Sequence, residues 1–378
     1  MTRNTRQRAV VVDETGWVVL GEADVPKLVP GKILVKVVTA AQNPADWKTV
    51  TLGKKTGATV GCDFAGIVEE IGPDVPEGVR TVGERVAGFV LSATGNNGSF
   101  SEYVVAPAQA VVHIPSTWSF EDAAQLGIAP FTAAQTLFLT LRLPTPLAPA
   151  PSPIPLLISG GSSSVGLYAI QLARLSGLRV LATASPKNFD LVKSYGVDEV
   201  YDYHDPEAGK KINRSTGGHL KEALDCIAER GTQALISDAL SDDGGIVAII
   251  NSCESPRAGV KVIFSTIATF LGEPIELPFP ATPTADDIEQ GKKYRKDVVR
   301  ASGLWENQAE SSFDPPEWTC ERTRRVEARE RWKGQCAENN VSDFRYTRQD
   351  ESRKAATMNL LSSESYVGPG SFSFQHRM

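Results

Sequence analysis

Cysteine and histidine are scarce in this chain of 378 residues. The four histidines, at positions 113, 204, 219 and 376, share no spacing that suits a metal site. The cysteines are odd in number and form no CxxC pair, which excludes a disulfide framework and is typical of a reducing compartment. They are Cys62, Cys226, Cys253, Cys320 and Cys336.

Long apolar runs and a strong charge of one sign are also absent. No stretch is long enough to span a bilayer, and no apolar segment follows the polar, basic residues 1–8. The net charge is −6, and this mixed balance disfavours nucleic acid or an anionic membrane as the main partner. We therefore expect a cytoplasmic protein, long enough for two domains with a core each.

The first third of the chain has the pattern of a β-rich domain. Short β-branched runs are separated by Gly, Pro and Asp turns, and their close spacing predicts a compact, barrel-like fold. Two helix-like stretches follow, and the second is apolar almost all round, so we expect it to be buried. The expected strands are Arg8–Val12, Trp17–Leu20, Ile33–Val38, Gly66–Ile71, Arg85–Phe89 and Tyr103–Val105, and the helices are Glu121–Leu126 and Thr132–Leu141.

The middle of the chain has the pattern of a parallel sheet. After the proline-rich segment Pro144–Pro155, which predicts a stiff, extended surface connection, strands and helices alternate at the lengths of βαβ units. From about Trp305 the chain is charged or Ser/Gly-rich without a clean period, which is typical of disorder. The expected strands are Leu156–Ser159, Arg179–Thr183, Glu199–Tyr201, Ala223–Ile227 and Ile246–Ile250, and the helices are Val165–Ser176 and Asn188–Tyr195.

A glycine-serine loop joins the first of these strands to the first helix. In Ile158–Gly166 (ISGGSSSVG), small residues allow the backbone to approach a pyrophosphate at the helix N-terminus. Gly160 and Gly166 take the outer positions of a GxGxxG-like register, while Ser163 stands where the pattern prefers glycine. Such a loop alone is weak evidence, but its place in a βαβ unit predicts a dinucleotide site.

The end of the next strand indicates which dinucleotide binds. An NAD site usually has an acidic residue there to hold the ribose 2′-hydroxyl, and Ala184–Asn188 (ASPKN) has none. Ser185 and Asn188 can form hydrogen bonds, and Lys187 can neutralise a 2′-phosphate. The alternative is a plain turn with a helix N-cap. We predict NADPH.

Five segments together resemble the medium-chain dehydrogenase/reductases, and most of all the fungal trans-acting enoyl reductases of the lovastatin type. The likeness runs from about residue 8 to about residue 304. It implies an α/β protein with a GroES-like β-rich catalytic domain and a Rossmann domain with a doubly wound parallel sheet. It also implies hydride transfer from NADPH to an α,β-unsaturated thioester carried by a polyketide synthase. The segments are GCDFAGIVEEIG (61–72), VGERVAG (82–88), GSFSEYV (98–104), ISGGSSSVG (158–166) and ATASPKNFDLVKSYGVDEVYDY (182–203).

The motif and the resemblance together nominate the site residues. Lys48 is the candidate catalytic residue, as a contact to the nicotinamide ribose or an aid to protonation, and its alternative is an exposed lysine in solvent. The cofactor candidates are Ala45, Asp46, Trp47, Lys48, Gly160, Gly161, Ser163, Ser164, Val165, Gly166, Ser185, Pro186, Lys187, Asn188, Tyr203, Ile250 and Asn251. The candidates for the substrate wall are Thr132, Ala133, Ala134, Gln135, Thr136 and Leu137.

The ligands of zinc-dependent relatives are missing from the sequence. Those proteins place a cysteine early and a His-Glu pair after the glycine at 61, whereas this chain has 41–44 (AQNP) and Cys62-Asp63. We interpret Cys62 as a small buried core residue. We therefore predict a zinc-free site, because reduction of a polarised C=C bond needs no Lewis acid.

We predict four parts in the chain. Residues 1–125 form the catalytic domain, 126–270 the NADPH-binding domain, 271–304 a partial return to the first, and 305–378 an atypical C-terminus. This last part lacks the closing strand expected of the family, through a misread exon boundary or frameshift or through genuine degeneration. Two other functions stay open: a stand-alone quinone or enone reductase, and an NADPH-binding, non-catalytic partner of a synthase.

Overall fold

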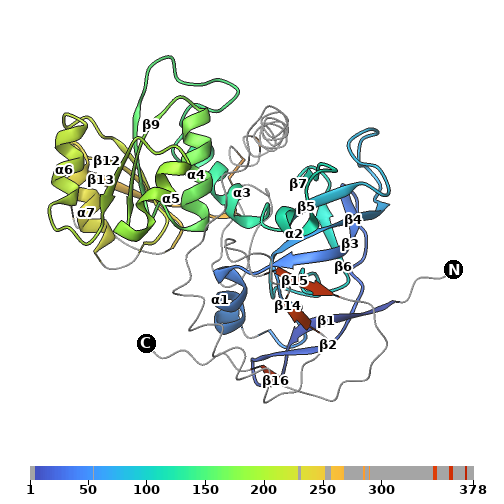
Figure 1. The fold of residues 1–378 in the computed structure, drawn as a ribbon. Helices are drawn as coiled ribbons and strands as arrows, with labels where there is room; N and C mark the ends of the chain where they lie inside the picture. Colours follow the sequence, from blue (N-terminus) through green and yellow to red (C-terminus); the bar gives the residue numbers. More distant parts are fainter. Residues whose placement is uncertain are drawn as a thin grey trace. The chain divides into compact units, whose positions relative to one another are not determined.

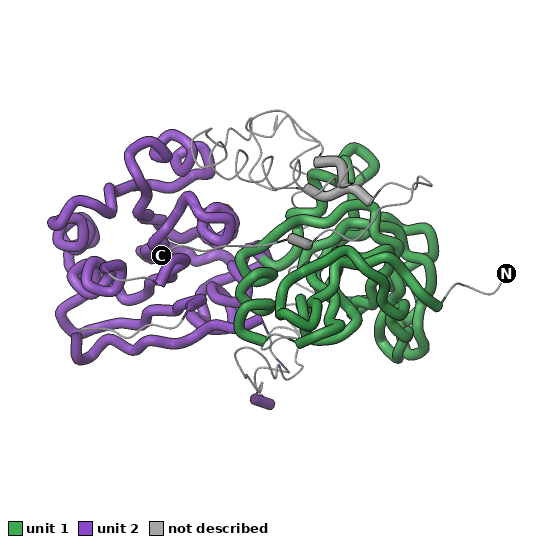
Figure 2. Tube along the Cα trace, turned by 90° about the horizontal axis from the view of Figure 1, so that it is seen from below, with its two compact units in different colours: residues 1–128, 276–280, 302–378 green, residues 129–275, 281–301 purple. Residues whose placement is uncertain are grey.

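A computed structural model describes the chain at residues 5–53, 55–228, 231–251 and 257–267, at the single residues 284, 285 and 289, and along the backbone of three short C-terminal strands. The chain divides into two compact units (Figure 2). Unit 1 comprises residues 1–128, 276–280 and 302–378, and unit 2 comprises 129–275 and 281–301. Apart from the residues named above, the predicted segments 271–304 and 305–378 lie outside the described residues.

Unit 1 is built from antiparallel strands (Figure 1), as the sequence predicted. Strands β1 and β2 form a hairpin, and β3 pairs with both β4 and β6 in the larger sheet. The strands are β1 (Arg6–Val12), β2 (Val18–Asp24), β3 (Lys32–Ala41), β4 (Asp63–Ile71), β5 (Arg85–Phe89), β6 (Tyr103–Pro107) and β7 (Val111–His113). Three short strands of the C-terminal part join these sheets, since β15 (Thr357–Leu360) pairs with β3 and with β14 (Phe344–Tyr346), and β16 (Ser371–Phe372) pairs with β2.

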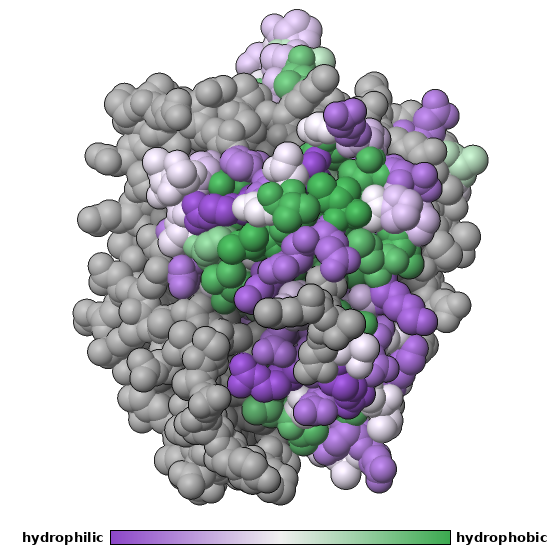
Figure 3. Space-filling view, turned by 90° about the vertical axis from the view of Figure 1, so that its right-hand side faces the viewer, coloured by the Kyte–Doolittle hydropathy of each residue, from purple (hydrophilic) through white to green (hydrophobic). Residues whose placement is uncertain are grey.

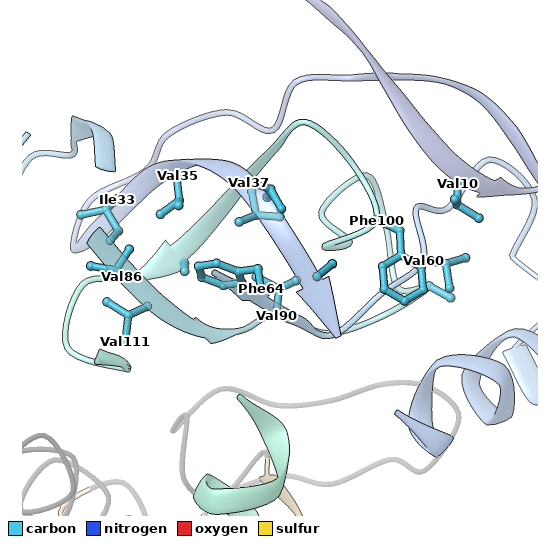
Figure 4. Close-up of a cluster of buried hydrophobic side chains, with 14 of the residues drawn as sticks. Val10, Ile33, Val35, Val37, Val60, Phe64, Val86, Val90, Phe100 and Val111 are labelled. Carbon is cyan, nitrogen blue, oxygen red and sulfur yellow. The ribbon is translucent and has the colours of Figure 1, made fainter. Parts of the chain in front are cut away.

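The core of unit 1 is formed by β-branched and aromatic side chains that point inward from facing strands (Figure 4). Ile33 and Val35 on β3 are fully buried, as are Phe64 on β4 and Val86 on β5. Burying a side chain of this size contributes about 1.5–3 kcal/mol. The β-branched runs read from the sequence therefore contribute to the stability of this unit.

Two helices lie in the described residues of unit 1. Helix α1 (Pro44–Gly53), which the sequence pattern did not reveal, starts with a proline, a residue favoured at the first helical position. The Asp46 carboxylate accepts a hydrogen bond from the Asn43 backbone amide at 2.7 Å, which satisfies an N–H at the helix start. Helix α2 (Phe120–Ala123) is capped by Ser119, whose hydroxyl accepts from the Asp122 amide at 3.0 Å.

Unit 2 contains a six-stranded, all-parallel sheet in the order β10-β9-β8-β11-β12-β13. In chain order this is 3-2-1-4-5-6, the doubly wound arrangement whose ligand crevice lies where the order reverses, between β8 and β11. The predicted fold class is confirmed. The strands are β8 (Pro155–Ser159), β9 (Arg179–Ala184), β10 (Glu199–Asp202), β11 (Glu222–Asp225), β12 (Gly245–Ile249) and β13 (Val260–Phe264).

The helices of unit 2 connect these strands, and α6 and α7 pack against each other. The predicted buried helix at Thr132–Leu141 forms as α3 (Ile128–Ala134) followed by a π-helical stretch at Gln135–Thr140. The others are α4 (Ser164–Leu175), a 3₁₀ turn at Pro186–Asn188, α5 (Phe189–Ser194), α6 (Ala208–Ser215) and α7 (Thr232–Ala239).

Two local expectations were wrong. The proline-rich connection is not extended throughout, because the Ala148 amide donates to the Thr145 carbonyl at 3.0 Å and closes a turn. The strand expected to run to Ile227 ends at Asp225, whose side chain accepts the amides of the next turn.

The described surface is mixed in character. On the face shown in Figure 3, hydrophobic and hydrophilic residues lie side by side. Within the described ranges, no helix combines the length and apolarity needed to cross a bilayer.

Candidate functional site

The glycine-serine loop follows β8 and is fastened to β9. Gly160 has φ +79°, in the left-handed region that favours glycine. Its amide donates to the Thr183 hydroxyl at 3.1 Å, and the Gly161 amide donates to the Thr183 carbonyl at 2.8 Å. Thr183, which the sequence did not nominate, therefore sets the path of the loop.

The three glycines of the loop leave no room for a side chain. A Cβ added at Gly166 would lie 2.3 Å from the Gly160 carbonyl oxygen. A Cβ at Gly161 would lie 2.9 Å from the Ala182 Cβ, and one at Gly160 would lie 2.6 Å from Ile227. The backbone is thus kept bare at the N-terminus of α4, which fits the pyrophosphate of a dinucleotide.

Ser163 explains the departure from the glycine pattern. Its hydroxyl accepts from the Gly166 amide at 3.1 Å and donates to the Gly160 carbonyl at 2.7 Å. It is therefore the N-cap of α4 and closes the loop on itself. The neighbouring Ser164 is exposed and Val165 is half-buried.

The predicted 2′-phosphate residues come together beside this loop. The Asn188 amide group donates to the Ser162 hydroxyl at 3.1 Å, which joins the 3₁₀ turn to the glycine loop. The Ser185 hydroxyl donates to the Tyr203 phenol oxygen at 3.3 Å. Pro186 and Lys187 are exposed. Strand β9 ends in Ala184, so no carboxylate of its own faces this position.

A turn after β11 completes the edge of the sheet. The buried Asp225 carboxylate accepts from the amides of Ile227 and Ala228, both at 3.0 Å. The Asn251 side chain donates to the Ile227 carbonyl at 3.1 Å, and Ile250 beside it is half-buried. Asp225 was missed from the sequence, although an acidic residue that ends a buried strand was a usable signal.

The candidates on α1 differ in exposure. Asp46 is buried, with 2% of its surface exposed, and accepts the Asn43 amide. Trp47 is exposed, and the Lys48 ammonium lies 5.8 Å from the centre of its ring, within cation–π range. Ala45 is half-buried. Trp47 is thus the exposed member of this predicted group, and Lys48 is half-buried beside it.

Helix α1 and the start of β4 bury two carboxyls and a thiol. Burial raises the pKa of Asp46 to about 6, against the opposing hydrogen bond from the Asn43 amide. Burial also raises the pKa of Asp63 well above its usual range, although Asp63 accepts the Ile128 amide at 2.7 Å. The pKa of the Cys62 thiol is raised by burial and then by the two carboxyls.

These residues do not fit a zinc ion. Zinc binds thiolate, and burial together with the two neighbouring carboxyls raises the pKa of the Cys62 thiol, which disfavours that form. In the part of the chain that the structure describes, no three His, Cys, Asp or Glu side chains gather in a group that could hold a metal.

Most residues of the predicted substrate wall are buried within unit 2. Thr132 is half-buried, and 133–137 are buried. The Thr136 hydroxyl donates to the Thr132 carbonyl at 2.7 Å and lies 3.0 Å from the Ser265 hydroxyl, and the Gln135 side chain donates to the Thr266 carbonyl. A π-helical stretch of this kind is frequent at functional sites.

The chain matches known families over both units. The alcohol dehydrogenase GroES-like domain matches residues 29–116, and the zinc-binding dehydrogenase domain matches residues 164–268. A crystal structure of an alcohol dehydrogenase superfamily protein from Novosphingobium aromaticivorans shares the fold, with a TM-score of 0.63 and 22% identity over 79% of this chain and 87% of that one.

Curated relatives narrow the family. The chain is 39% identical to the trans-enoyl reductase ACTTS2 of Alternaria alternata, over 77% of this chain and 85% of that protein. It is 36% identical to the trans-enoyl reductase TOXD of Cochliobolus carbonum, over 71% and 92%. The fold and the glycine cradle formed by Gly160, Gly161 and Gly166 define an oxidoreductase of the medium-chain dehydrogenase/reductase family. Within that family the chain belongs with the fungal trans-enoyl reductases, as the sequence predicted.

Proposed function

We propose that this chain reduces the C=C bond of an α,β-unsaturated acyl thioester with NADPH, without zinc, in the cytoplasm. The observation that carries the choice of cofactor is the carboxylate-free end of β9 beside the glycine cradle. An NAD site would hold the ribose 2′-hydroxyl with an acidic residue there. Lys187 is exposed at this position and has no ion-pair partner among the described residues.

The chain's own residues divide the work of binding. Gly160, Gly161 and residues 163–166 receive the pyrophosphate, because the three glycines keep the backbone bare at the N-terminus of α4. Ser185, Pro186, Lys187 and Tyr203 border the 2′-phosphate, and Asn188 joins their turn to the glycine loop. Ile250 and Asn251 make further contacts to the cofactor. When bound, NADPH supplies the hydride that adds to the β-carbon of the thioester.

The proton that completes the reduction needs a donor. We assign Lys48 one of two roles, either this donation or a contact to the nicotinamide ribose. Its ammonium lies beside the exposed Trp47. The stretch 132–137 supplies the wall for the acyl chain. The Cys62 thiol and the Asp63 carboxyl do not fit zinc. We therefore assign the polarisation of the thioester carbonyl to hydrogen-bond donors.

The names of the relatives support a substrate delivered by another protein. Two relatives that are 36–39% identical over 71–77% of this chain are trans-enoyl reductases. A trans-acting enzyme receives its acyl thioester from a separate synthase, and we propose a polyketide synthase in this role.

A binding titration followed by a single-turnover measurement tests the proposal. The full chain is titrated with NADPH and NADH while nicotinamide fluorescence is recorded, and stopped-flow oxidation is then followed with a crotonyl thioester or with a benzoquinone. We expect tighter binding of NADPH and oxidation that depends on the thioester. Oxidation by quinone alone would indicate a stand-alone quinone reductase, and binding without oxidation would indicate a non-catalytic partner. Failure to bind NADPH would overturn the proposal.

A further inference from the structure

A carboxylate stands close to the predicted 2′-phosphate pocket, at the end of the neighbouring strand. Asp202 is the last residue of β10, and its Cα is paired in register with Ala184 at the end of β9. Adjacent strands lie about 4.8 Å apart, so Asp202 is one strand spacing from the start of the pocket. An unengaged carboxylate at this distance would repel a 2′-phosphate.

His204 engages this carboxylate twice. Its backbone amide donates to Asp202 Oδ1 at 3.0 Å, and its ring Nδ1 lies 2.8 Å from the same oxygen. These hydrogen bonds, led by the one from the backbone amide, lower the pKa of Asp202, so the carboxylate is charged at neutral pH. His204 therefore fixes where a permanent negative charge points.

Tyr203 connects this pair to the pocket itself. Its ring centroid lies 4.0 Å from that of His204, with an angle of 33° between the ring planes. Its phenol oxygen accepts from the Ser185 hydroxyl at the other end. The imidazole thus touches both the carboxylate to be restrained and an aromatic side chain that borders the predicted 2′-phosphate position.

The next carboxylate along the chain is restrained in the same way. Asp205 follows in the turn after β10 and lies 2.5 Å from the Lys211 ammonium on α6. Both acidic side chains at this end of β10 are therefore held by a basic or imidazole partner. This arrangement suits a pocket that must accept an anion beside two carboxylates.

We propose that His204 is a specificity-determining positioning residue for NADPH. By holding Asp202 and by supporting Tyr203, it keeps the negative charge at the end of β10 from opposing the 2′-phosphate. The inference rests on the proposed use of NADPH. It predicts that the effect of His204 on binding requires the Asp202 carboxylate and is confined to the dinucleotide that carries the 2′-phosphate.

A double-mutant cycle tests this dependence. His204→Phe keeps a ring beside Tyr203 but removes the nitrogen that contacts Asp202, and Asp202→Asn removes the charge. Dissociation constants for NADPH and NADH are measured by fluorescence titration for wild type, both single variants and the double variant. His219→Phe is the matched control, because His219 is exposed and precedes the opposite, amino end of strand β11.

The expected effect is confined to NADPH binding, and it disappears when the Asp202 carboxylate is removed. His204→Phe removes the ring contact but keeps the backbone amide bond to Asp202, so it weakens NADPH binding roughly threefold, as expected for the loss of one modest hydrogen bond, and leaves NADH unchanged. In the Asp202→Asn background the same substitution has no effect. Equal weakening of both dinucleotides, or a loss that persists without the carboxylate, would show a merely structural role and overturn the inference. Wild type without a preference for NADPH would instead refute the proposed cofactor.

Discussion

Buried carboxylates in the two units have different surroundings. At the sheet edge of unit 2, Asp225 accepts from two backbone amides, from the Thr232 hydroxyl at 2.7 Å and from the Gln233 side chain at 2.6 Å. In unit 1, one oxygen of Asp46 accepts the Asn43 amide, but the other has no hydrogen-bond partner among the described residues.

This difference separates a carboxylate that shapes a binding loop from carboxyls whose charge is penalised. Asp225 fixes the turn that faces Gly160, so its charge is matched by donors. Burial raises the pKa of Asp46 and of Asp63, and the hydrogen bonds that they accept from the Asn43 and Ile128 amides oppose it only in part. Hydrogen bonds therefore organise the dinucleotide edge of unit 2. In unit 1, the protonation of Asp46 and Asp63 makes stability depend on pH.

The largest effect is expected from Gly166→Ala. The added Cβ would lie 2.3 Å from the Gly160 carbonyl oxygen, a backbone atom that cannot move without opening the loop. We expect the free energy of unfolding to fall by about 3 kcal/mol, the upper range of overpacking, and NADPH binding to weaken by more than tenfold. Urea denaturation and fluorescence titration measure the two quantities. Gly95→Ala, where nothing lies within 4 Å of the added Cβ, is the control. Normal NADPH binding by Gly166→Ala would contradict the cradle.

Asp46→Asn tests the pH dependence of unit 1. The pKa of Asp46 is raised from 3.8 to about 6, so the folded state binds more protons than the unfolded chain between these values. Stability from this group is complete below about pH 4 and is lost as pH rises through 6, by roughly 3 kcal/mol.

Removing the titrating group should therefore stabilise the protein only at higher pH. We expect the free energy of unfolding of Asp46→Asn, relative to wild type, to increase between pH 4.5 and 7.5 in urea denaturation. Glu77→Gln alters an exposed carboxyl in the same unit and should give no such increase. A difference that is constant with pH would show that Asp46 is already ionised throughout this range.

The sequence predicted the local structure of the unit 2 loop better than that of α1, for physical reasons. The glycine loop obeys a local rule, since strand, small residues and helix follow one another directly. Helix α1 was hidden because Thr49, Val50 and Thr51 are β-branched and weaken the helical signal. The buried state of Asp63 depends on tertiary packing, although its position between Cys62 and Phe64 in an apolar run was a signal.

Contacts between distant segments were beyond the sequence pattern. Thr183 binds Gly160, which lies 23 positions earlier in the chain. The contact of Asp202 with His204 is local, but it depends on where β10 ends. Such pairings follow from where elements end, and element ends are the least certain part of a sequence-based prediction. The cradle could thus be located from sequence, but the residues that hold it in shape could not.

Lys187→Met should produce a smaller and selective effect at the unit 2 edge. Removing a cation that faces the 2′-phosphate is expected to weaken NADPH binding roughly tenfold, the size of one charge-assisted hydrogen bond, without changing NADH binding. Lys193→Met removes an equally exposed lysine from the last turn of α5 and serves as the control. Fluorescence titration compares the three proteins. An equal change in both dinucleotides would argue that Lys187 does not meet the 2′-phosphate.

The smallest effect, expected from Asn188→Ala, sharpens the comparison within this edge. Asn188 is adjacent to Lys187, but its amide is bound to Ser162 in the glycine loop. Losing one such neutral hydrogen bond costs about 1 kcal/mol, so both NADPH and NADH should bind roughly fivefold more weakly. The two variants should thus differ in cofactor selectivity. Lys187→Met is expected to weaken NADPH binding alone, whereas Asn188→Ala is expected to disturb the loop that both dinucleotides use. If titration showed Asn188→Ala to affect NADPH alone, Asn188 would have to leave Ser162 and bind the 2′-phosphate directly.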